Sequence, residues 1–290
     1  MKKVNLYAIA VSMMMFSNYA CNTEDFNAKE EVQSTEEFQS TEKSDEKEEL
    51  QPVNELYEKM ERAFQLSSTN DLEQFFKDWN ESVFPNTVEF IQQNDTVEAI
   101  YEVYKLFYEP LDLTKLGNWE ELSKNLNSNC KYVAVQNKII YGVVEDIISS
   151  ELPSYYYSLH SAYDTINDFR PSINMAKEQV LYLLPEYEEA LNIFMRTESI
   201  GKESTEYNWG NYEDILKRYE FIRPYIPILR GHWGLYWHLA THPQIHQIVF
   251  NKPLNKAIIY FRVGYQGGEV ILKKQANQWT IIESRVTWIE

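Results

Sequence analysis

The stretch KAIIYFRVGYQGGEVILKKQANQWTIIESRVTWIE, residues 256–290, decides the fold class. It consists of short segments rich in β-branched and aromatic residues, separated by QGG and QAN, which are typical turn sequences. With HQIVFN just before it, the pattern predicts an antiparallel β-meander over residues 241–290, with tight turns at Gly267–Gly268 and at Asn277. Strand alternation places Ile259, Phe261 and Val263 on one face, and Tyr260 and Arg262 on the other.

Residues 52–240 carry mainly helical patterns. Apolar residues recur at helical spacing in 53–66, 70–83 and 95–107, and both Asn70 with Glu73 and Asp95 with Glu98 are spaced as capping pairs. Further helices are predicted over 117–126, from Pro185 onward and around 212–219. A helical region followed by a meander that packs on it predicts an α+β fold.

Two segments of this region allow more than one assignment. KYVAVQNKIIYGVVED, residues 131–146, fits a β-hairpin, and a helix over 139–148 is the alternative. SYYYS, residues 154–158, fits either a stacking platform for sugar rings or a half-buried edge of a strand or helix.

The N-terminus has the layout of a secretory signal peptide. Lys2 and Lys3 precede an apolar run over 4–16 that is too short to span a bilayer, and Ala20 lies before Cys21. This layout resembles the bacterial lipoprotein signal, which implies that residues 1–20 are removed and that Cys21 becomes a lipid-bearing N-terminus. The alternative is ordinary cleavage after Ala20, which leaves a secreted protein with a free Cys21.

The segment that follows Cys21 is strongly acidic and poor in apolar residues. Such a sequence cannot bury enough surface to offset the entropy of ordering, so residues 21–51 are expected to be the lipidated cysteine and a disordered tether. Glu24 and Asp25 resemble the export signal of lipoproteins displayed on the surface of some Gram-negative cells. The expected location is therefore the cell envelope, at the outer membrane and exposed at its surface.

Composition limits the partners. The formal charge of −17 excludes nucleic acid, whose binding draws on a basic surface. The 21 Tyr, 14 Phe and 7 Trp belong mostly in a core, although Tyr and Trp also line sugar- and peptide-binding faces. The expected partners are the membrane, through the lipid on Cys21, and a protein or glycan. No cofactor is indicated.

Four of the five histidines lie within RGHWGLYWHLATHPQIH, and they are the candidates for a pocket or a metal site: His232, His238, His242 and His246. His238 and His242 are spaced to clamp a metal from one helix face, but Pro243 breaks that helix before His246. Packing of a helix end is the alternative. Cys130 has no histidine near it in the sequence, which indicates an unreactive thiol rather than a nucleophile.

Several phrases carry a family resemblance: LFYEPLDLTKLGNWEEL, KYVAVQNKIIYGVV, RPSINMAKEQVLYLLPEYEEALNIF and the meander itself. They resemble a group of signal-bearing bacterial lipoproteins with no assigned activity. The meander is also similar to the sheet of NTF2-like domains, a fold that serves enzymes and binding proteins alike. The expected function is non-enzymatic binding or assembly in the envelope. The alternative is an NTF2-like domain that binds or hydrolyses a small molecule in a histidine-containing pocket.

Overall fold

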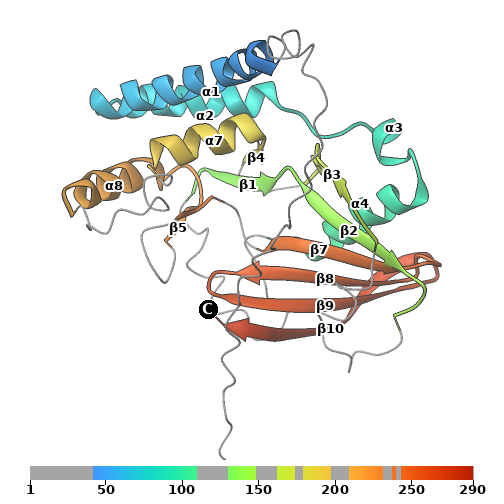
Figure 1. Ribbon diagram of the computed structural model, residues 1–290. Helices are drawn as coiled ribbons and strands as arrows, with labels where there is room; N and C mark the ends of the chain where they lie inside the picture. The colour runs from blue at the N-terminus through green and yellow to red at the C-terminus, as the bar shows by residue number, and fades with distance from the viewer. Residues whose placement is uncertain are drawn as a thin grey trace, which may run out of the picture. The chain divides into compact units, whose positions relative to one another are not determined.

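The computed structural model describes residues 42–109, 130–147, 162–173, 179–196, 209–230, 237–239 and 243–289. Residues 45–290 form one compact unit. The fold is α+β, as predicted, with helices in the N-terminal part and strands toward the C-terminus (Figure 1). The described helices are α1 (Glu42–Gln65), α2 (Thr69–Ser82), α3 (Val88–Ile91), α4 (Asp95–Phe107), α7 (Pro185–Phe194) and α8 (Trp209–Ile222).

The described strands form three sheets. The largest has the order β10-β9-β8-β7-β2-β3, and two smaller sheets pair β1 with β4 and β5 with β6. The bounds are β1 (Tyr132–Gln136), β2 (Ile139–Val144), β3 (Ala162–Ile166), β4 (Gln179–Leu183), β5 (Leu229–Arg230), β6 (Trp237–His238), β7 (Gln244–Asn251), β8 (Lys256–Val263), β9 (Gln266–Gln275) and β10 (Gln278–Ile289).

Helix α1 begins earlier than the sequence indicated. Its first residue is Glu42, so residues 42–51 are helical although they were expected to belong to the disordered tether. Glu, Lys and Leu dominate this segment and are good helix formers, and acidic residues near a helix N-terminus interact favourably with its dipole. These local preferences continue the helix outward from the apolar pattern that begins at Val53.

The predicted capping residues of α2 and α4 are wrong. The N-cap of α2 lies two residues before the predicted Asn70, and the N-cap of α4 lies one residue before the predicted Asp95. The Ser68 hydroxyl accepts a hydrogen bond from the Asp71 N–H at 3.2 Å, so α2 starts before Asn70. The Asn94 side chain accepts from the Val97 N–H at 2.9 Å, so Asp95 is already helical. In each case the N-cap is a Ser or Asn residue whose backbone is extended, as an N-cap requires.

Two of the remaining helix predictions are confirmed, and one cannot be compared with the described residues. Helix α7 starts at Pro185, as predicted, and α8 contains the segment 212–219. The short helix α3 was not predicted. The predicted helix over 117–126 and the tyrosine segment 154–158 lie outside the described residues. Among the described helices, none has both the length and the apolar character needed to cross a bilayer.

The segment 131–146 forms two strands, but they do not pair as a hairpin. Strand β1 pairs in parallel with β4, whereas β2 joins the large sheet between β3 and β7. The hairpin and the helix are therefore both wrong. Tyr132 to Val135 are all buried, with Tyr132 in the hydrophobic cluster of α1, α2, α7 and α8 and Val135 in the cluster with α4, so β1 lies in the interior on both of its faces.

Strands β7 to β10 form the predicted antiparallel meander, which the parallel pairing of β2 with β7 extends into a mixed sheet. The first predicted turn is wrong: Gly267 and Gly268 lie inside β9, and the turn is at Gly264–Tyr265. Gly264 takes a left-handed φ of 58°, which glycine adopts without strain. The second turn is confirmed, because Ala276 and Asn277 both have positive φ, as a two-residue hairpin loop requires.

Strand β10 runs through QWTIIES and RVTWI as one strand at an edge of the large sheet. Two register shifts interrupt its pairing with β9, between Ile281 and Glu283 and between Val286 and Trp288. Each shift is a bulge, which bends the strand and increases its twist.

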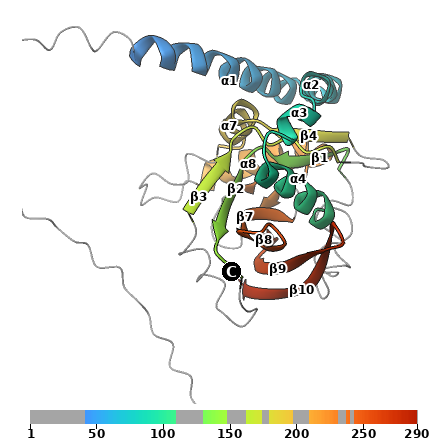
Figure 2. The same cartoon turned by 90° about the vertical axis from the view of Figure 1, so that its right-hand side faces the viewer.

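Two hydrophobic clusters hold the described elements together. One joins α4 to the inner face of the large sheet, which we define as the face in contact with α4 (Figure 2). The other joins α1, α2, α7 and α8 to β1 and β4. In the second cluster, Trp79 stacks on Tyr187 with ring centroids 4.2 Å apart.

Candidate functional site

The large sheet has two chemically different faces. On the inner face, Ile259, Phe261 and Val263 of β8 are buried in the cluster with α4, as strand alternation predicted. Tyr260 and Arg262 belong to the opposite face, which we call the outer face. The inner face is a packed apolar core, which leaves the outer face as the candidate site.

Four polar side chains lie in one row across the outer face. Gln247 of β7 pairs with Tyr260 of β8, Tyr260 pairs with Glu269 of β9, and Glu269 pairs with Arg285 of β10. Directly paired residues have side chains on the same face, about 5 Å apart. We call these four residues the Glu269 row.

Glu269 is buried, with 2% of its surface exposed. One carboxylate oxygen, Oε1, accepts hydrogen bonds from the Arg285 guanidinium. The other, Oε2, is buried and has no hydrogen-bond partner in the part of the chain that the structure describes. Burial raises the pKa of Glu269, and the nearby Arg285 partly offsets this rise. A buried carboxylate with one oxygen unpaired is unfavourable, and such a group in a native protein calls for an explanation.

Within the described ranges, Gln247 has an unpaired hydrogen-bond donor, whereas Glu269 has an unpaired acceptor. Its side chain is 8% exposed, and its Nε2 donor also lacks a partner among the described residues. Glu269 and Gln247 are separated by the strand that carries Tyr260, and two strand spacings amount to about 10 Å. The row therefore contains one buried acceptor and one buried donor that are unpaired, with an aromatic side chain between them.

An aromatic group lies next to the row on the same face. Gly267 pairs with both Arg262 and Trp288, and an added Cβ at Gly267 would overlap the Trp288 indole. The indole thus lies directly against the β9 backbone, and the Arg262 guanidinium lies over its ring at 5.9 Å. Trp288 is 42% exposed. We call Arg262, Gly267 and Trp288 the Trp288 platform, which is about 7 Å along the strands from the Glu269 row.

The other end of the outer face is apolar. Val249, Ile258 and Ile271 are buried together with Ile147 in a small cluster of their own. The outer face therefore changes from buried apolar side chains, through the Glu269 row, to a tryptophan that solvent reaches.

Of the four candidate histidines, the structure brings one close to this site. His246 is the extra residue of a bulge in β7, between Ile245 and Gln247, and its side chain is exposed. Partial desolvation of the ring and the positive charge of Arg262 both lower the pKa of His246. His246 is therefore a neutral neighbour of the row at physiological pH.

The other histidines do not form the predicted helical clamp in the described residues. His238 lies in strand β6, so the helix that would space it four residues from His242 is not present at this position. His232 and His242 lie outside the described residues. Within the parts of the chain that are described, no group of three or more His, Cys, Asp or Glu side chains is arranged to hold a metal.

A cavity of about 500 Å³ lies beside α4. Its lining residues are Asp95, Glu98, Ala99, Glu102, Pro253, Leu254, Asn255, Lys274, Ala276 and Asn277, and they include no histidine. Glu102 accepts hydrogen bonds from Lys274 Nζ at 2.8 Å and from Trp279 Nε1 at 2.9 Å. The lysine is thus already paired, and the other polar side chains of the lining are carboxylates and amides.

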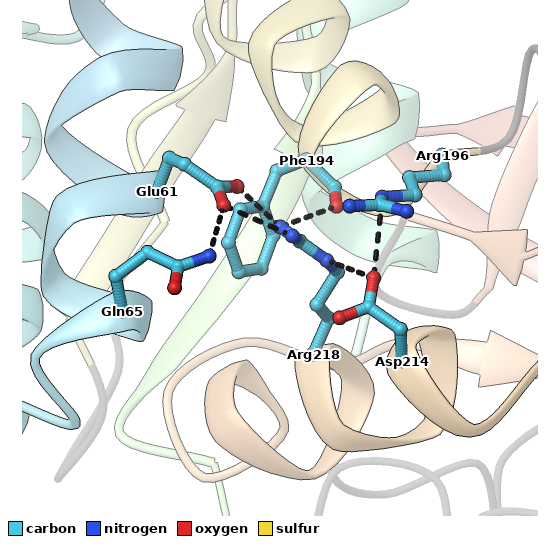
Figure 3. A network of polar contacts seen from close by, with 6 residues as sticks. All are labelled: Glu61, Gln65, Phe194, Arg196, Asp214 and Arg218. Carbon is cyan, nitrogen blue, oxygen red and sulfur yellow. Dashed lines mark hydrogen bonds and ion pairs between the residues drawn. The ribbon is translucent and has the colours of Figure 1, made fainter. Parts of the chain in front are cut away.

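Arg218 is a second buried charge, and it differs from Glu269 in being fully paired (Figure 3). Its side chain is 1% exposed. The guanidinium donates to both oxygens of Glu61 at 2.5 and 3.0 Å, to Asp214 at 2.8 Å and to the Phe194 carbonyl at 3.4 Å. Its guanidinium lies 4.6 Å from the ring centre of Phe64. Because every nitrogen has a partner, we assign this network to the packing of α1, α7 and α8.

Cys130 matches the expectation of an unreactive thiol. It is partly buried and its Sγ donates to the Arg223 carbonyl at 3.6 Å. Burial raises the pKa of the thiol to about 11, so the nucleophilic thiolate is scarce at neutral pH.

The raised pKa of Glu269 leads to a prediction about stability. A carboxyl group with a raised pKa in the folded state contributes most to stability at acid pH, and this contribution is lost as the pH rises through the folded-state value. We expect the free energy of unfolding of Glu269→Gln, relative to the natural protein, to increase as the pH rises from about 4.5 to neutrality. Urea unfolding at a series of pH values measures this difference.

Glu81→Gln is the control, because Glu81 has a side chain that is 63% exposed and belongs to α2 rather than to the large sheet. Its stability relative to the natural protein should change less over the same range. If the free energy of unfolding of Glu269→Gln, relative to the natural protein, stays constant or falls with rising pH, the prediction is wrong. The folded protein would then tolerate the charged form of Glu269 as well as the unfolded chain does.

The sequence pointed to two of the six side chains of this site. Alternation placed Tyr260 and Arg262 on one face, but Gln247, Glu269, Arg285 and Trp288 were not recognised. A correct turn at Gly264–Tyr265 would have given the register that sets Glu269 opposite Tyr260.

Comparisons with protein-family models, with curated proteins and with solved structures each returned no match for this chain.

Proposed function

We propose that this chain is a non-catalytic binding protein of a bacterial cell envelope, held at the membrane by a lipid on Cys21, and that its ligand contacts the outer face of the large sheet. The observation that carries the proposal is the Glu269 row. It holds a buried acceptor and a buried donor without partners in the described residues, next to an exposed tryptophan.

The chemistry of the row favours binding over catalysis. The Gln247 amide does not transfer protons, and the Glu269 carboxylate is held by Arg285. These groups form directional hydrogen bonds, which is what recognition requires. An NTF2-like hydrolytic pocket gains no support from the described residues, because His246 is exposed and the cavity beside α4 is lined by no histidine.

The membrane attachment rests on the signal-like residues 1–20 and on Cys21. In bacterial cells that make the full chain, we expect mass spectrometry of the mature protein to find an N-terminal Cys21 that carries acyl chains. Cys21→Ala should move the protein from the membrane fraction to the soluble fraction. An unmodified N-terminus in membrane-bound protein would contradict the lipid anchor.

A photo-crosslinker tests the binding surface without assuming the class of ligand. The full chain carries benzoylphenylalanine at position 283, on the outer face of β10 and 41% exposed, and is irradiated in the cells that produce it. We expect an adduct, with glycan or protein, that is absent when the same group is at position 286. Val286 is a matched control, because it is 42% exposed but faces the inner side of the same strand. Equal labelling at both positions, or none, would contradict binding at the outer face.

A further inference from the structure

We infer that the outward edge of β10 is an interface between two copies of this chain, which pair antiparallel around a twofold axis at Ser284. The pairing joins the two large sheets edge to edge. It needs neither the lipid on Cys21 nor a ligand on the outer face, so it is separate from the proposed function. The open edge, the charges along it and their symmetric spacing support this pairing.

Strand β10 lies at an edge of the large sheet, and β9 is its only neighbour among the described strands. Every second residue of an edge strand directs its backbone N–H and C=O away from the sheet, where another strand can pair with them. Ile282 and Val286 are 58% and 42% exposed. An edge strand that carries exposed apolar side chains is a template for pairing with another chain.

The two bulges of β10 limit the length of strand that pairs. Between them, from Glu283 to Val286, the register with β9 is regular. A second strand can follow this segment but not the bent strand on either side of it. A twofold pair also uses the same edge of both copies, so the assembly closes at two copies. The interface is therefore short.

The faces of the sheet restrict the register of the pair. Two sheets that continue one another around a twofold axis keep their outer faces on the same side, so an outer residue must be opposite another outer residue. Glu283 and Arg285 are both on the outer face, because their partners in β9, Ile271 and Glu269, are on it. The axis therefore passes through a residue of β10 and not between two residues.

Charge selects Ser284 as the position of the axis. With the axis at Ser284, Glu283 of each copy is opposite Arg285 of the other, which gives two favourable pairs of opposite charge. With the axis at Glu283 or at Arg285, two like charges would be directly opposite each other, which is unfavourable. With the axis at Val286, the pairing would run into the second bulge. The regular segment thus has one register that is complementary to itself.

Arg285 can bind this second carboxylate although it already binds Glu269. Its Nε and Nη2 atoms face Glu269, whereas Nη1 lies 3.9 Å from Glu283 of the same copy, beyond hydrogen-bond distance. The side chains of Arg285 and Glu283 are 37% and 41% exposed, so both are accessible to a second copy. A guanidinium has five N–H donors, which allows one arginine to bind two carboxylates. Because Glu269 already holds the guanidinium, little side-chain freedom is lost on pairing.

The pair is expected to be weak. Its short segments bury less than the roughly 800 Å² that each partner contributes to a stable interface, so we expect a dissociation constant of about 10 to 100 μM. The charge of −17 on each copy also opposes association, and salt at about 0.15 M screens this repulsion beyond about 8 Å. Analytical ultracentrifugation at this ionic strength measures the dimer. The purified full chain carries Cys21→Ala and Cys130→Ala, so that neither lipid nor a disulfide joins the copies.

Glu283→Lys tests the charge pairs. It places two cations opposite each other at both symmetric positions, and it should weaken the dimer about tenfold or more. Glu81→Lys is the matched control, because it changes the net charge by the same amount at an exposed position of α2, and it should not weaken the dimer. Circular dichroism checks that both variants fold.

A spin label tests the register. Gln278 is exposed at the start of β10 and lies six residues before Ser284. Two copies that pair at Ser284 place their labels at position 278 about twelve residues apart along the strands, which is about 40 Å. An axis moved by two residues would change this distance by about 13 Å. Pulsed electron paramagnetic resonance of Gln278→Cys, in the chain without its native cysteines, measures the distance.

A chain that stays monomeric at concentrations above the expected dissociation constant would overturn the pairing. A dimer that is as tight with Glu283→Lys as without it would also overturn it, as would labels whose separation differs from the expected one by more than about 10 Å. None of these results bears on the proposed function. In the photo-crosslinking experiment, an adduct between two copies has twice the mass of the chain, which separates it from an adduct with a ligand.

Discussion

Arg218→Ala is expected to lower the free energy of unfolding by about 3 to 5 kcal/mol, because it breaks a buried ion pair and leaves carboxylates without their partner. Arg218 is 1% exposed and pairs with Glu61 of α1 and Asp214 of α8. It also lies over the rings of Phe64 and Phe194, so the substitution removes packing as well as charge. Urea unfolding followed by circular dichroism measures the loss.

Lys217→Ala is the control for this experiment. Lys217 precedes Arg218 on α8 and forms an ion pair with Glu213, but both side chains are more than half exposed. We expect its loss to change stability by about 0 to 1 kcal/mol. Arg218→Lys should remain strongly destabilised, since an ammonium group cannot bind both Glu61 oxygens in the same planar geometry. If Arg218→Ala and Lys217→Ala lower the free energy of unfolding equally, the buried position of the Arg218 network contributes nothing to stability.

The same pair gives a pH dependence of the opposite sign to that of Glu269. Hydrogen bonding to Arg218 lowers the pKa of Glu61 below its usual value of 4.5. A carboxyl group with a lowered pKa contributes stability above its unfolded-state value and loses it as the pH falls through the folded-state value. Arg218→Ala should therefore make stability less sensitive to acid below about pH 4.5.

Trp79→Ala is expected to lower the free energy of unfolding by about 3 to 5 kcal/mol, the range for removal of a large buried aromatic side chain. Trp79 has no exposed surface, its ring stacks on Tyr187, and its Nε1 donates to the Tyr182 carbonyl at 3.0 Å. The substitution opens a cavity between α2, α7 and β4. Thermal and urea unfolding, measured together, give the size of the effect.

Two further variants separate packing from hydrogen bonding at this position. Trp79→Phe keeps much of the ring but removes one of two hydrogen bonds to the Tyr182 carbonyl, which still accepts from the Leu184 N–H at 2.9 Å, so the loss of this hydrogen bond should cost about 0.5 to 1.5 kcal/mol. Phe84→Ala is the exposed control, because Phe84 is 65% exposed, and it should stay within about 0.5 kcal/mol of the natural protein. A small effect of Trp79→Ala would mean that the helical cluster readily closes around the missing ring.

Local patterns predicted the fold where local physics determines it. The apolar spacing of 95–107 and the proline at 185 located α4 and α7, and alternation assigned the faces of β8. Capping was misassigned because the choice among neighbouring polar residues depends on which one takes an extended backbone. Ser68 and Asn94 do so in this protein.

Pairing between distant segments could not be predicted in the same way. Strands β1 and β2 are separated by two residues, which suggested a hairpin, yet each finds its partner far along the chain in β4 and β7. The candidate site depends on this kind of information, because four strands contribute to the Glu269 row. The histidines were predicted as a site because they lie close together in the sequence. The residues of the Glu269 row are far apart in the sequence, and the pairing register of β7 to β10 brings them together.

The two bulges in β10 have a consequence for how copies of this chain meet one another. An edge strand of twelve residues with exposed Ile282, Val286 and Trp288 offers backbone groups and apolar side chains to a second molecule. Bulges twist such an edge, so two copies cannot align in a long, flat ladder. The irregular edge thus disfavours fibrous aggregation while leaving Trp288 accessible.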